Sequence, residues 1–517
     1  MRNNKNEKYI EYEDIPRSVR NMKKKKKKNK NMNEKDFDKN NKKNKFKKIL
    51  KIVLIILVLL LIIHTIITIH RWKTLAKDML LLQNSIVLDI DENQIASLGS
   101  YKKQIVVSSD KIPDQLKDAY VAIEDERFYK HHGVDVKRTG GAILSYITHF
   151  GKSSFGGSTI TQQLVKNMTG DASSSIGRKT TEWWRSWILE SFTSKDEILT
   201  TYLNIIYVAP KTYGVEAGSK YYFNKSCSEL TLEECAFLAG INNSPNSYNP
   251  FEENDHHELI YKRTKTVLDK MKDLDYISKS EYDTAISNLE KGLNFEQGEI
   301  ESDDGIYSYH TDALISEVAS DLSKKYHISS NFANNYLEMA GLTIYSTQDT
   351  NLQKETEIEF EKSKYSLASQ YGNSPSQAAM VIIDHKAGYV VACCGGLGEK
   401  TESRPLNRAT QSIRQTGSAM KPLAILAPAI DKKIITAASI YDDTEKDFED
   451  GYHPVDYNTP LGEITVRRAV ESSQNVPFVE IMEELKPKNS IKYMKKMGIT
   501  TLTKKDETLS LALRRIR

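Results

Sequence analysis

An uninterrupted apolar run near the N-terminus constrains this chain more than any other feature. Residues 52–69 carry no charge, and only His64, Thr65 and Thr68 among them are not aliphatic. As a helix rising about 1.5 Å per residue, the run measures about 27 Å, close to the roughly 30 Å hydrocarbon thickness of a bilayer. A buried core helix is an alternative, and a cleavable signal peptide has a shorter apolar run of about 7–15 residues. We predict an uncleaved transmembrane anchor over residues 49–71.

Charge is distributed unevenly about this anchor. Residues 1–51 hold 20 Lys and Arg against 7 Asp and Glu, whereas the remaining residues hold 53 against 62. A basic run such as Lys23 to Lys28 would suit a nucleic-acid-binding arm in a soluble protein. Next to a membrane anchor, the positive-inside rule instead places the basic side in the cytoplasm. We therefore predict a basic, disordered cytoplasmic tail over residues 1–48, near anionic lipid and without a nucleic-acid partner.

The length of 517 residues predicts roughly three folded units of about 150 residues each. Four cysteines are too few and too irregularly spaced for a disulfide scaffold or a zinc site. Residues 110–245 are typical of helices: Ser194 and Glu197 form a capping box, and Gly240 is placed to end a later helix. Because no strand alternation interrupts this segment, we expect a compact all-helical domain of about 150 residues.

Three polar clusters inside this helical segment are hard to explain by packing. EDERFYKHHGVD (124–135) sets carboxylates beside aromatics and histidines, and GGSTITQQLVKN (156–167) follows a flexible glycine pair with hydroxyl, amide and ammonium groups. RKTTE (178–182) adds two cations and a carboxylate. Each cluster alone is also typical of a solvated surface. Together they suit glycosyl transfer from a pyrophosphate-activated sugar, with a carboxylate as base and cations that stabilise the leaving group.

The three clusters, in this order, resemble the peptidoglycan glycosyltransferase domain of class A penicillin-binding proteins. The likeness continues through SKDEILTTYLNIIYV, TYGVEAGSKYYF and LTLEECAFLAGINNSPNSYNP, and covers about residues 98–251. It implies a helical, lysozyme-like fold whose cleft receives a lipid-linked disaccharide from the bilayer.

The resemblance also implies residue roles. Glu124 would be the general base for the 4-hydroxyl of the acceptor sugar, with Asp125 shaping its environment. Glu182 would be the second essential carboxylate, acting directly or through a divalent cation such as Mg²⁺ or Mn²⁺, although the sequence shows no metal cage. The residues expected to bind substrate are Asp125, Phe128, His131, Thr159, Gln163, Lys166, Arg178 and Lys179. His132 matches no motif position and is expected at the surface, and the tryptophans Trp183, Trp184 and Trp187 suit a membrane-contacting face or core packing.

The C-terminal part begins with a hairpin signature, AAMVIIDHKAGYVVACCGG from Ala378, in which two apolar strands flank a turn. RQTGSAMKP then places Ser418 and Lys421 three residues apart, on one face of a predicted helix start, so that the amine can reach the hydroxyl. This pair and the following Ser473-Gln474-Asn475 resemble the first two motifs of penicillin-binding transpeptidases. By that resemblance Ser418 is the acyl-enzyme nucleophile, Lys421 its base, and Ser473 and Asn475 the proton relay and substrate anchor; β-lactam antibiotics would bind here.

The third motif of that family, Lys-Ser/Thr-Gly, does not occur after Asn475 in the printed sequence, and LSLALRRIR (509–517) turns abruptly basic. In the family, this motif lies on a strand that contributes to the oxyanion hole. We therefore expect a truncated transpeptidase domain with impaired activity.

The prediction as a whole is a multidomain, single-pass cell-membrane enzyme that polymerises lipid-linked disaccharide-peptide into glycan strands. Two other hypotheses stay open: a non-catalytic cell-wall scaffold or binding protein, and a lysozyme-like hydrolase, which would not need a cationic pyrophosphate clamp. The predicted units after the anchor are a membrane-proximal linker (72–97), an all-α glycosyltransferase domain (98–251), a connector (252–376) and an incomplete α/β transpeptidase domain (377–517).

Overall fold

The computed structural model describes residues 17–141, 157–173, 175–252, 256–368, 375–414, 416–448 and 451–513. Residues 1–16 of the predicted tail and Gly156 of the second cluster lie outside these ranges. The chain divides into two compact units. The N-terminal unit comprises Met1–Gly305 and Ile315–Ser346, and the C-terminal unit comprises Ile306–Leu314 and Thr347–Arg517.

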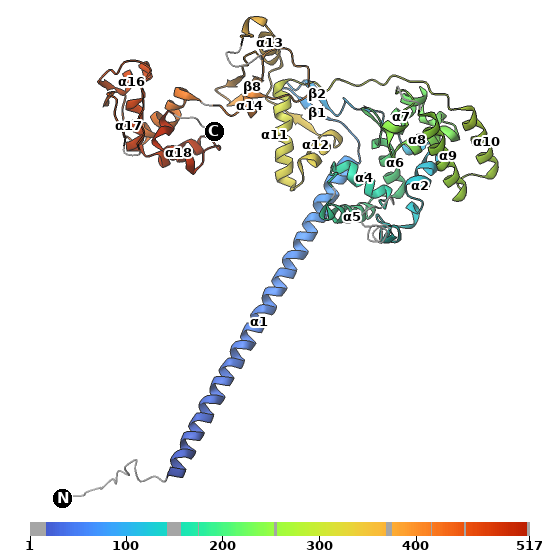
Figure 1. Ribbon diagram of the computed structural model, residues 1–517, viewed down its shortest axis with the longest axis horizontal. Coiled ribbons are helices and arrows are strands. Elements are labelled where there is room, and N and C mark those ends of the chain that lie inside the picture. Colours follow the sequence, from blue (N-terminus) through green and yellow to red (C-terminus); the bar gives the residue numbers. More distant parts are fainter. Residues whose placement is uncertain are drawn as a thin grey trace. The chain divides into compact units, whose positions relative to one another are not determined.

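A single long helix, α1 (Arg17–Met79), contains the apolar run (Figure 1). Its segment Lys47–Met79 is long and apolar enough to cross a membrane. The prediction of a disordered tail through residue 48 differs from the structure, in which the helix begins at Arg17. Neither Gly nor Pro interrupts the sequence of α1, and Lys is a good helix former. The last turns of α1 join the folded core, where Trp72 is buried and its indole N–H donates to the Arg185 carbonyl at 3.0 Å.

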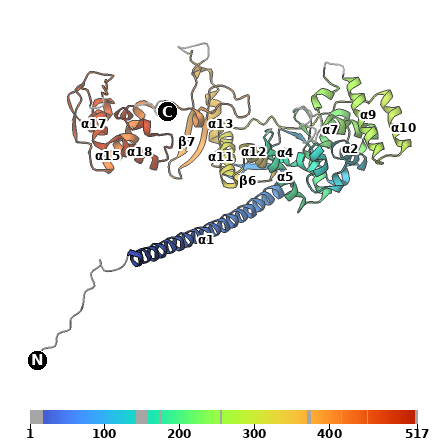
Figure 2. The same ribbon diagram turned by 60° about the horizontal axis from the view of Figure 1, so that its bottom comes forward.

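Helices build most of the N-terminal unit, and α2, α7, α9 and α10 lie together in both views (Figure 1, Figure 2). Every residue of α8 (Leu232–Ile241) is buried. Gly240 does not end this helix: a Cβ there would lie 3.2 Å from Cγ of Arg263, so the glycine permits close approach of α9. The remaining helices are α2 (Asp114–Glu124), α4 (Ile160–Thr169), α5 (Ile176–Glu190), α6 (Lys195–Ile205), α7 (Val215–Phe223), α9 (His257–Asp273), α10 (Lys279–Lys291) and α12 (Ser330–Met339).

The predicted connector contributes directly to this core. Ile260, Val267 and Leu268 of α9 and Leu289 of α10 are buried in the same hydrophobic cluster as α2 and α8. The charged composition of this segment predicts only a connecting role. In the structure, each of these two helices buries one apolar face against α8 or α9 and exposes its charged residues on the opposite face.

Two small sheets complete the N-terminal unit. The first has the order β3 (Lys103–Gln104), β5 (Thr212–Tyr213), β4 (Tyr207–Ala209), and the second has the order β2 (Gln94–Leu98), β1 (Ser85–Leu88), β6 (Thr343–Tyr345). The domain is therefore mostly helical, with one small sheet. The sequence does not predict β3, β4 and β5, because strands of two or three residues are too short to show alternation. β6 pairs in parallel with β1 and joins the predicted connector to the predicted membrane-proximal linker.

The C-terminal unit contains the expected hairpin. β7 (Met380–Asp384) pairs antiparallel with β8 (Tyr389–Cys394), and Cys393 and Cys394 are buried. A second hydrophobic cluster surrounds α17 (Val476–Leu485), where Phe478 and Met482 are fully buried. The other elements are α11 (Tyr309–Tyr326, shared between the units), α13 (Thr350–Phe360), α14 (Arg408–Gln411), α15 (Ala427–Asp431), β9 (Ile440–Asp442), β10 (Glu463–Thr465), α16 (Val466–Ser472) and α18 (Pro487–Lys496).

Candidate active site

Glu124, the predicted base, is the last residue of α2 and is partly accessible to solvent. Its Oε2 accepts a hydrogen bond from Nε2 of Gln163 on α4 at 2.8 Å, and its Oε1 accepts one from Nδ2 of Asn242 at 3.0 Å. Both carboxylate oxygens are therefore held by amide donors from other elements. These amides orient the carboxylate without supplying a positive charge.

Tyr202 closes this arrangement into a ring of hydrogen bonds. Its hydroxyl donates to Oε1 of Gln163 at 2.9 Å and accepts from Nδ2 of Asn242 at 2.9 Å. Burial, reinforced by the nearby Glu124 carboxylate, raises the pKa of Tyr202 well above its ordinary value, so the phenol stays a neutral donor. No spacing or motif in the sequence singles out Tyr202 or Asn242, although both lie in segments that carry the family resemblance.

Four predicted substrate-binding residues support the site from inside the fold. Asp125 is fully buried, and its Oδ2 accepts from the Ile160 N–H at the start of α4 at 3.0 Å and interacts with Nε2 of His131 at 2.9 Å. Thr159 is the N-cap of α4, and Phe128 is fully buried. The side chains of Asp125, Phe128, His131 and Thr159 are all buried, and their contact with substrate stays a prediction. Their motif letters cannot distinguish a residue that binds ligand from one that anchors the helix carrying the binding residues.

The third cluster forms a compact ionic group on one turn of α5. Glu182 is only 5% exposed, and its two carboxylate oxygens pair with Arg178 and Lys179, four and three residues earlier respectively. Lys179 also donates to Oγ of Ser158 at 2.8 Å. Two cations against one carboxylate leave a net positive charge, and Arg178 and Lys179 keep part of their side-chain surface accessible.

Helix α4 links the base to these cations. Gln163, on its second turn, contacts Glu124, and Ser158, two residues before its start, contacts Lys179. Lys166 lies one turn beyond Gln163 and is exposed, and no hydrogen bond or ion pair of its ammonium is found among the residues that the structure describes. The structure thus brings Glu124, Gln163, Lys179 and Glu182 around one helix.

A divalent cation finds no ready cage in this arrangement. Among the described residues, no three His, Cys, Asp or Glu side chains come together in a way that could hold a metal ion. Both oxygens of Glu182 are already paired with cations.

His132 and two of the three tryptophans on α5 lie at the surface. His132 is exposed. Trp184 and Trp187 expose 38% and 46% of their surface, whereas Trp183 is half-buried, so these tryptophans are neither wholly core nor wholly surface.

In the C-terminal unit, three of the four predicted catalytic residues lie together, because Ser473 and Asn475 contact Lys421. Its buried ammonium donates to the carbonyls of Ser473 and Gln474 at 2.8 Å each, and to Oδ1 of Asn475 at 2.9 Å; Oγ of Ser473 lies at 3.5 Å. Three acceptors match the three N–H donors of a charged lysine. Burial lowers the pKa of Lys421 to about 8, and the Asp456 and Asp443 carboxyl groups act in the opposite direction.

Ser418 does not join this group. It is exposed in a 3-10 turn, Gly417–Met420, and within the described part of the chain its hydroxyl has no hydrogen bond to Lys421. The predicted α-helical start is also different, because the 3-10 turn runs into a π-helix, Pro422–Leu426, in which the Ala427 N–H bonds to the Pro422 carbonyl. π-Turns of this kind are frequent at functional sites.

Comparison with known proteins defines the class of molecule. A transglycosylase family matches residues 91–272, and a penicillin-binding protein transpeptidase domain family matches residues 378–510. Penicillin-binding protein 1A of Clostridium botulinum is 38% identical over 436 residues, which are 80% of this chain and 52% of that protein. Penicillin-binding protein 1A of Clostridium perfringens is 37% identical over 81% of this chain and 64% of that protein. Penicillin-binding protein 1F of Bacillus subtilis is 34% identical over 87% of this chain and 59% of that protein.

These matches place a transglycosylase domain before a transpeptidase domain in one chain. The chain belongs to the class A penicillin-binding proteins. It spans between 52% and 64% of the length of the three relatives.

Proposed function

We propose that the N-terminal unit is a membrane-anchored peptidoglycan glycosyltransferase that joins lipid-linked disaccharide-peptides into glycan strands. The family supports this activity, and the geometry around α4 supports the assignment of roles. The observation that carries the assignment is the position of Glu124, which is accessible, held by two neutral amides and connected through α4 to the Arg178–Lys179–Glu182 group. The substrates are the lipid-linked precursor and the growing strand.

The reaction follows from these positions. Glu124 takes the proton from the 4-hydroxyl of the acceptor sugar while that oxygen attacks the anomeric carbon of the donor. The bond from the anomeric carbon to the pyrophosphate breaks with inversion, and Arg178 and Lys179 stabilise the charge that grows on the leaving oxygens. Glu182 keeps both cations in place on the same helical turn.

Replacing the base tests this function directly. We expect Glu124→Gln in the full-length, detergent-solubilised protein to lower polymerisation of lipid-linked disaccharide-peptide by at least a hundredfold, since general bases contribute about 10²–10⁴ in rate. Glu126→Gln is the matched control, because Glu126 is two residues away, exposed, and paired with Lys270 at 3.6 Å. Normal polymerisation by Glu124→Gln would contradict the assignment. Absence of polymer from the wild type would favour the scaffold hypothesis, and shortening of added glycan would favour hydrolysis.

We further propose that α1 crosses the cell membrane once, with the basic N-terminus in the cytoplasm and both matched domains outside. The apolar segment and the excess of lysine before it support this orientation. Protease added to intact cells stripped of their wall should remove the domains beyond residue 72 and leave a tag at the N-terminus protected. Digestion of that tag in intact cells would contradict the orientation.

The C-terminal unit carries a second candidate function, a serine-type D-Ala-D-Ala transpeptidase that β-lactams acylate at Ser418. The arrangement of Lys421, Ser473 and Asn475 favours it. Because the Lys421 ammonium is bound to three oxygens and has no bond to Ser418 in the described structure, we expect slow acylation. Fluorescent penicillin should label the wild type slowly and Ser418→Ala not at all. Equal labelling of both proteins would contradict the role of Ser418.

A further inference from the structure

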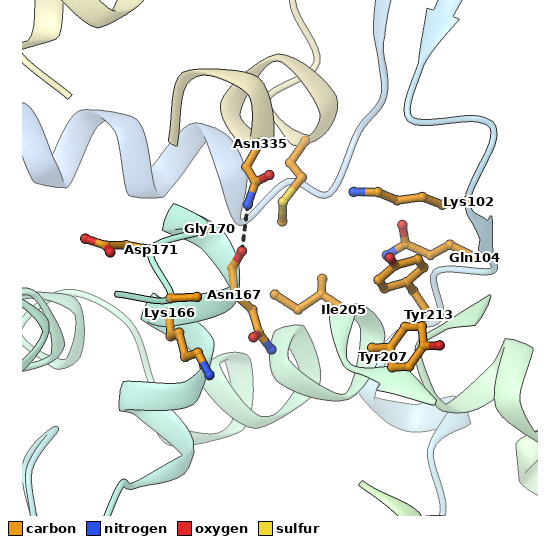
Figure 3. Close-up of a pocket in the computed structure, with 12 residues that line it drawn as sticks. Lys102, Gln104, Lys166, Asn167, Gly170, Asp171, Ile205, Tyr207, Tyr213 and Asn335 are labelled. Atoms are coloured by element: carbon orange, nitrogen blue, oxygen red, sulfur yellow. Dashed lines mark hydrogen bonds between the residues drawn. The ribbon is translucent and has the colours of Figure 1, made fainter. Parts of the chain in front are cut away.

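A cavity of about 520 Å³ lies between the last turn of α1 and the first turn of α6. It is distinct from the cavity along α4 that Figure 3 shows, which is lined by Lys166 and belongs to the proposed glycosyltransferase site. Its volume is within the range of about 300–1,000 Å³ that is typical of pockets for small ligands. Residues of opposite charge and residues with hydroxyl groups line it, among them Lys77, Thr193 and Asp196.

The proposed membrane crossing of α1 places this cavity next to the lipid headgroups. A hydrocarbon layer of about 30 Å within a bilayer of about 40–45 Å leaves about 5–8 Å for each headgroup layer. At about 1.5 Å per residue, Lys73 lies about 6 Å and Lys77 about 12 Å beyond Ile69, the last residue of the apolar run. Long lysine side chains reach back to the interface from such positions. Both ammonium groups can therefore contact the phosphates of lipid headgroups.

The two lysines lie next to the same aromatic ring at the cavity. Nζ of Lys73 is 5.5 Å and Nζ of Lys77 is 5.8 Å from the centroid of the Phe192 ring, and Phe192 lines the cavity. Neither lysine has an ion pair among the residues that the structure describes. Two uncompensated positive charges near one ring favour a bound anion such as a phosphodiester.

Two carboxylates from α6 line the same cavity. Asp196 and Glu197 are exposed, and within the described part of the chain neither forms a salt bridge. Oδ1 of Asp196 accepts from Oγ of Ser109 at 2.8 Å, and Oε2 of Glu197 accepts from the Ser194 N–H at 2.8 Å. These bonds orient the carboxylates and leave their charges uncompensated. The ammonium of Lys77 and these carboxylates thus line one cavity without pairing, which leaves room for a ligand that carries both charges.

The cavity also has hydroxyl groups that lack partners. Thr193 is only 9% exposed, and its Oγ1 is buried without a hydrogen-bond partner among the described residues. Oγ1 of Thr200, which also lines the cavity, is in the same state. A buried hydroxyl without a hydrogen bond is unfavourable, and a hydroxyl can donate to a phosphate oxygen. A phosphate bound at this wall would supply the missing acceptor.

We infer that this cavity binds the headgroup of a phospholipid with a primary amine, its phosphate next to Lys73 and Lys77 and its ammonium next to Asp196 and Glu197. A primary ammonium has three N–H donors for carboxylate oxygens, whereas a trimethylammonium has none. A glycerol headgroup carries no positive charge for the carboxylates. The cavity therefore selects ethanolamine over choline and glycerol. The inference goes beyond glycosyl transfer and rests on the proposed membrane crossing of α1.

Lipid retention by the full-length, detergent-solubilised protein tests this site. The protein is incubated with equal amounts of phosphatidylethanolamine, phosphatidylcholine and phosphatidylglycerol that have identical acyl chains, and the lipids that stay bound are counted by native mass spectrometry. We expect about fivefold more bound phosphatidylethanolamine than of either other lipid. Equal retention of the three lipids, or a preference for one of the other two, would overturn the headgroup assignment. Because no polymer is measured, failure of the proposed glycosyltransferase function would leave this result unchanged.

Removing the two cations tests the phosphate side of the site. Lys73→Gln/Lys77→Gln should lower the retention of phosphatidylethanolamine about fivefold, because the phosphate loses both positive partners. Lys111→Gln/Lys291→Gln is the matched control, since it removes two exposed lysine charges elsewhere on the same unit, and it should retain lipid like the wild type. Equal losses in the two variants would overturn the site.

Removing the two carboxylates tests the amine side independently. Asp196→Asn/Glu197→Gln keeps the oxygens that accept from Ser109 and Ser194, so the start of α6 should stay intact. This variant should retain phosphatidylethanolamine and phosphatidylcholine equally; an unchanged preference for phosphatidylethanolamine would overturn the amine contact.

A soluble headgroup distinguishes a lipid site from a site for free phosphate esters. Glycerophosphoethanolamine at the concentration of the lipid should leave the bound phosphatidylethanolamine unchanged, because acyl chains next to α1 raise the local concentration of the lipid headgroup. Displacement of the lipid by this soluble ester would overturn a phospholipid as the occupant.

Discussion

At the level of single residues, the ring around Glu124 shows how a base is held in one orientation. Two amide donors satisfy its oxygens, and Tyr202 fixes both amides. The cations instead surround Glu182, where leaving-group charge would form.

Removing the Tyr202 hydroxyl should therefore affect catalysis. Tyr202→Phe leaves Oε1 of Gln163 without this donor and removes one of the two acceptors of the Asn242 amide. A misaligned Glu124 should slow polymerisation about tenfold, equivalent to about 1.4 kcal/mol. Tyr120→Phe is the control, since Tyr120 is equally buried but its hydroxyl donates to the Leu238 carbonyl at 2.9 Å and takes no part in the ring of hydrogen bonds. Initial rates measured below the unfolding temperature decide. Equal rates in the two variants would show that the ring has only a structural role.

Lys421 gives a prediction about pH. With its pKa near 8, the neutral amine that could act as a base becomes populated as pH rises, so acylation by penicillin should increase through about pH 8 and then level off. Asp456 stabilises the charged form, and Asp456→Asn should therefore lower the pKa and move the profile to lower pH. Asp447→Asn, which alters an exposed carboxylate, should leave the midpoint unchanged. A midpoint that moves upward in Asp456→Asn would contradict this electrostatic account.

At the level of elements, one glycine controls how α7 begins. Gly214, the N-cap of α7, has a φ of +84°, and a Cβ there would lie 2.5 Å from the Asn204 carbonyl oxygen. The strand β5 must therefore turn directly over the end of α6, and other residues cannot follow that path without strain.

Gly214→Ala should accordingly destabilise the N-terminal unit by about 2–4 kcal/mol, since both backbone strain and a steric clash are introduced. Gly177→Ala is the control, because Gly177 lies on α5 with no atom within 4 Å of its Cβ position. That change should be neutral or stabilise by up to about 1 kcal/mol. The thermal midpoints of the detergent-solubilised proteins give the comparison; similar midpoints would mean that the loop adjusts freely.

At the level of the complete chain, two hydrophobic clusters predict two unfolding events. One contains Leu238 and the other Met482, both fully buried. Leu238→Ala and Met482→Ala should each cost about 2–5 kcal/mol, and each should lower only one of two calorimetric transitions. A single transition that both substitutions shift equally would show that the units unfold together.

The anchor, the helical character of the first domain, the hairpin in the second domain and the positions of Glu124, Glu182 and Lys421 in motifs could all be predicted from the sequence. Each is a local pattern: an apolar run of fixed length, a cap at fixed spacing, or a cluster of chemical groups within one turn. The short strands were missed, because two residues carry no periodicity, and so was the packing of α9 and α10 on the core.

Tertiary structure alone decided which motif residues are accessible and which are buried. Asp125, Thr159, Gln163 and Lys166 all lie in the polar clusters of the sequence. Asp125 and Thr159 are buried next to the start of α4, whereas Gln163 and Lys166 lie along its accessible side. The partners Tyr202 and Asn242 stand 78 and 118 residues after Glu124, as their numbering shows, and only chain folding brings them to it. Local sequence fixes which groups a segment offers, whereas burial and contact depend on distant segments that no short pattern records.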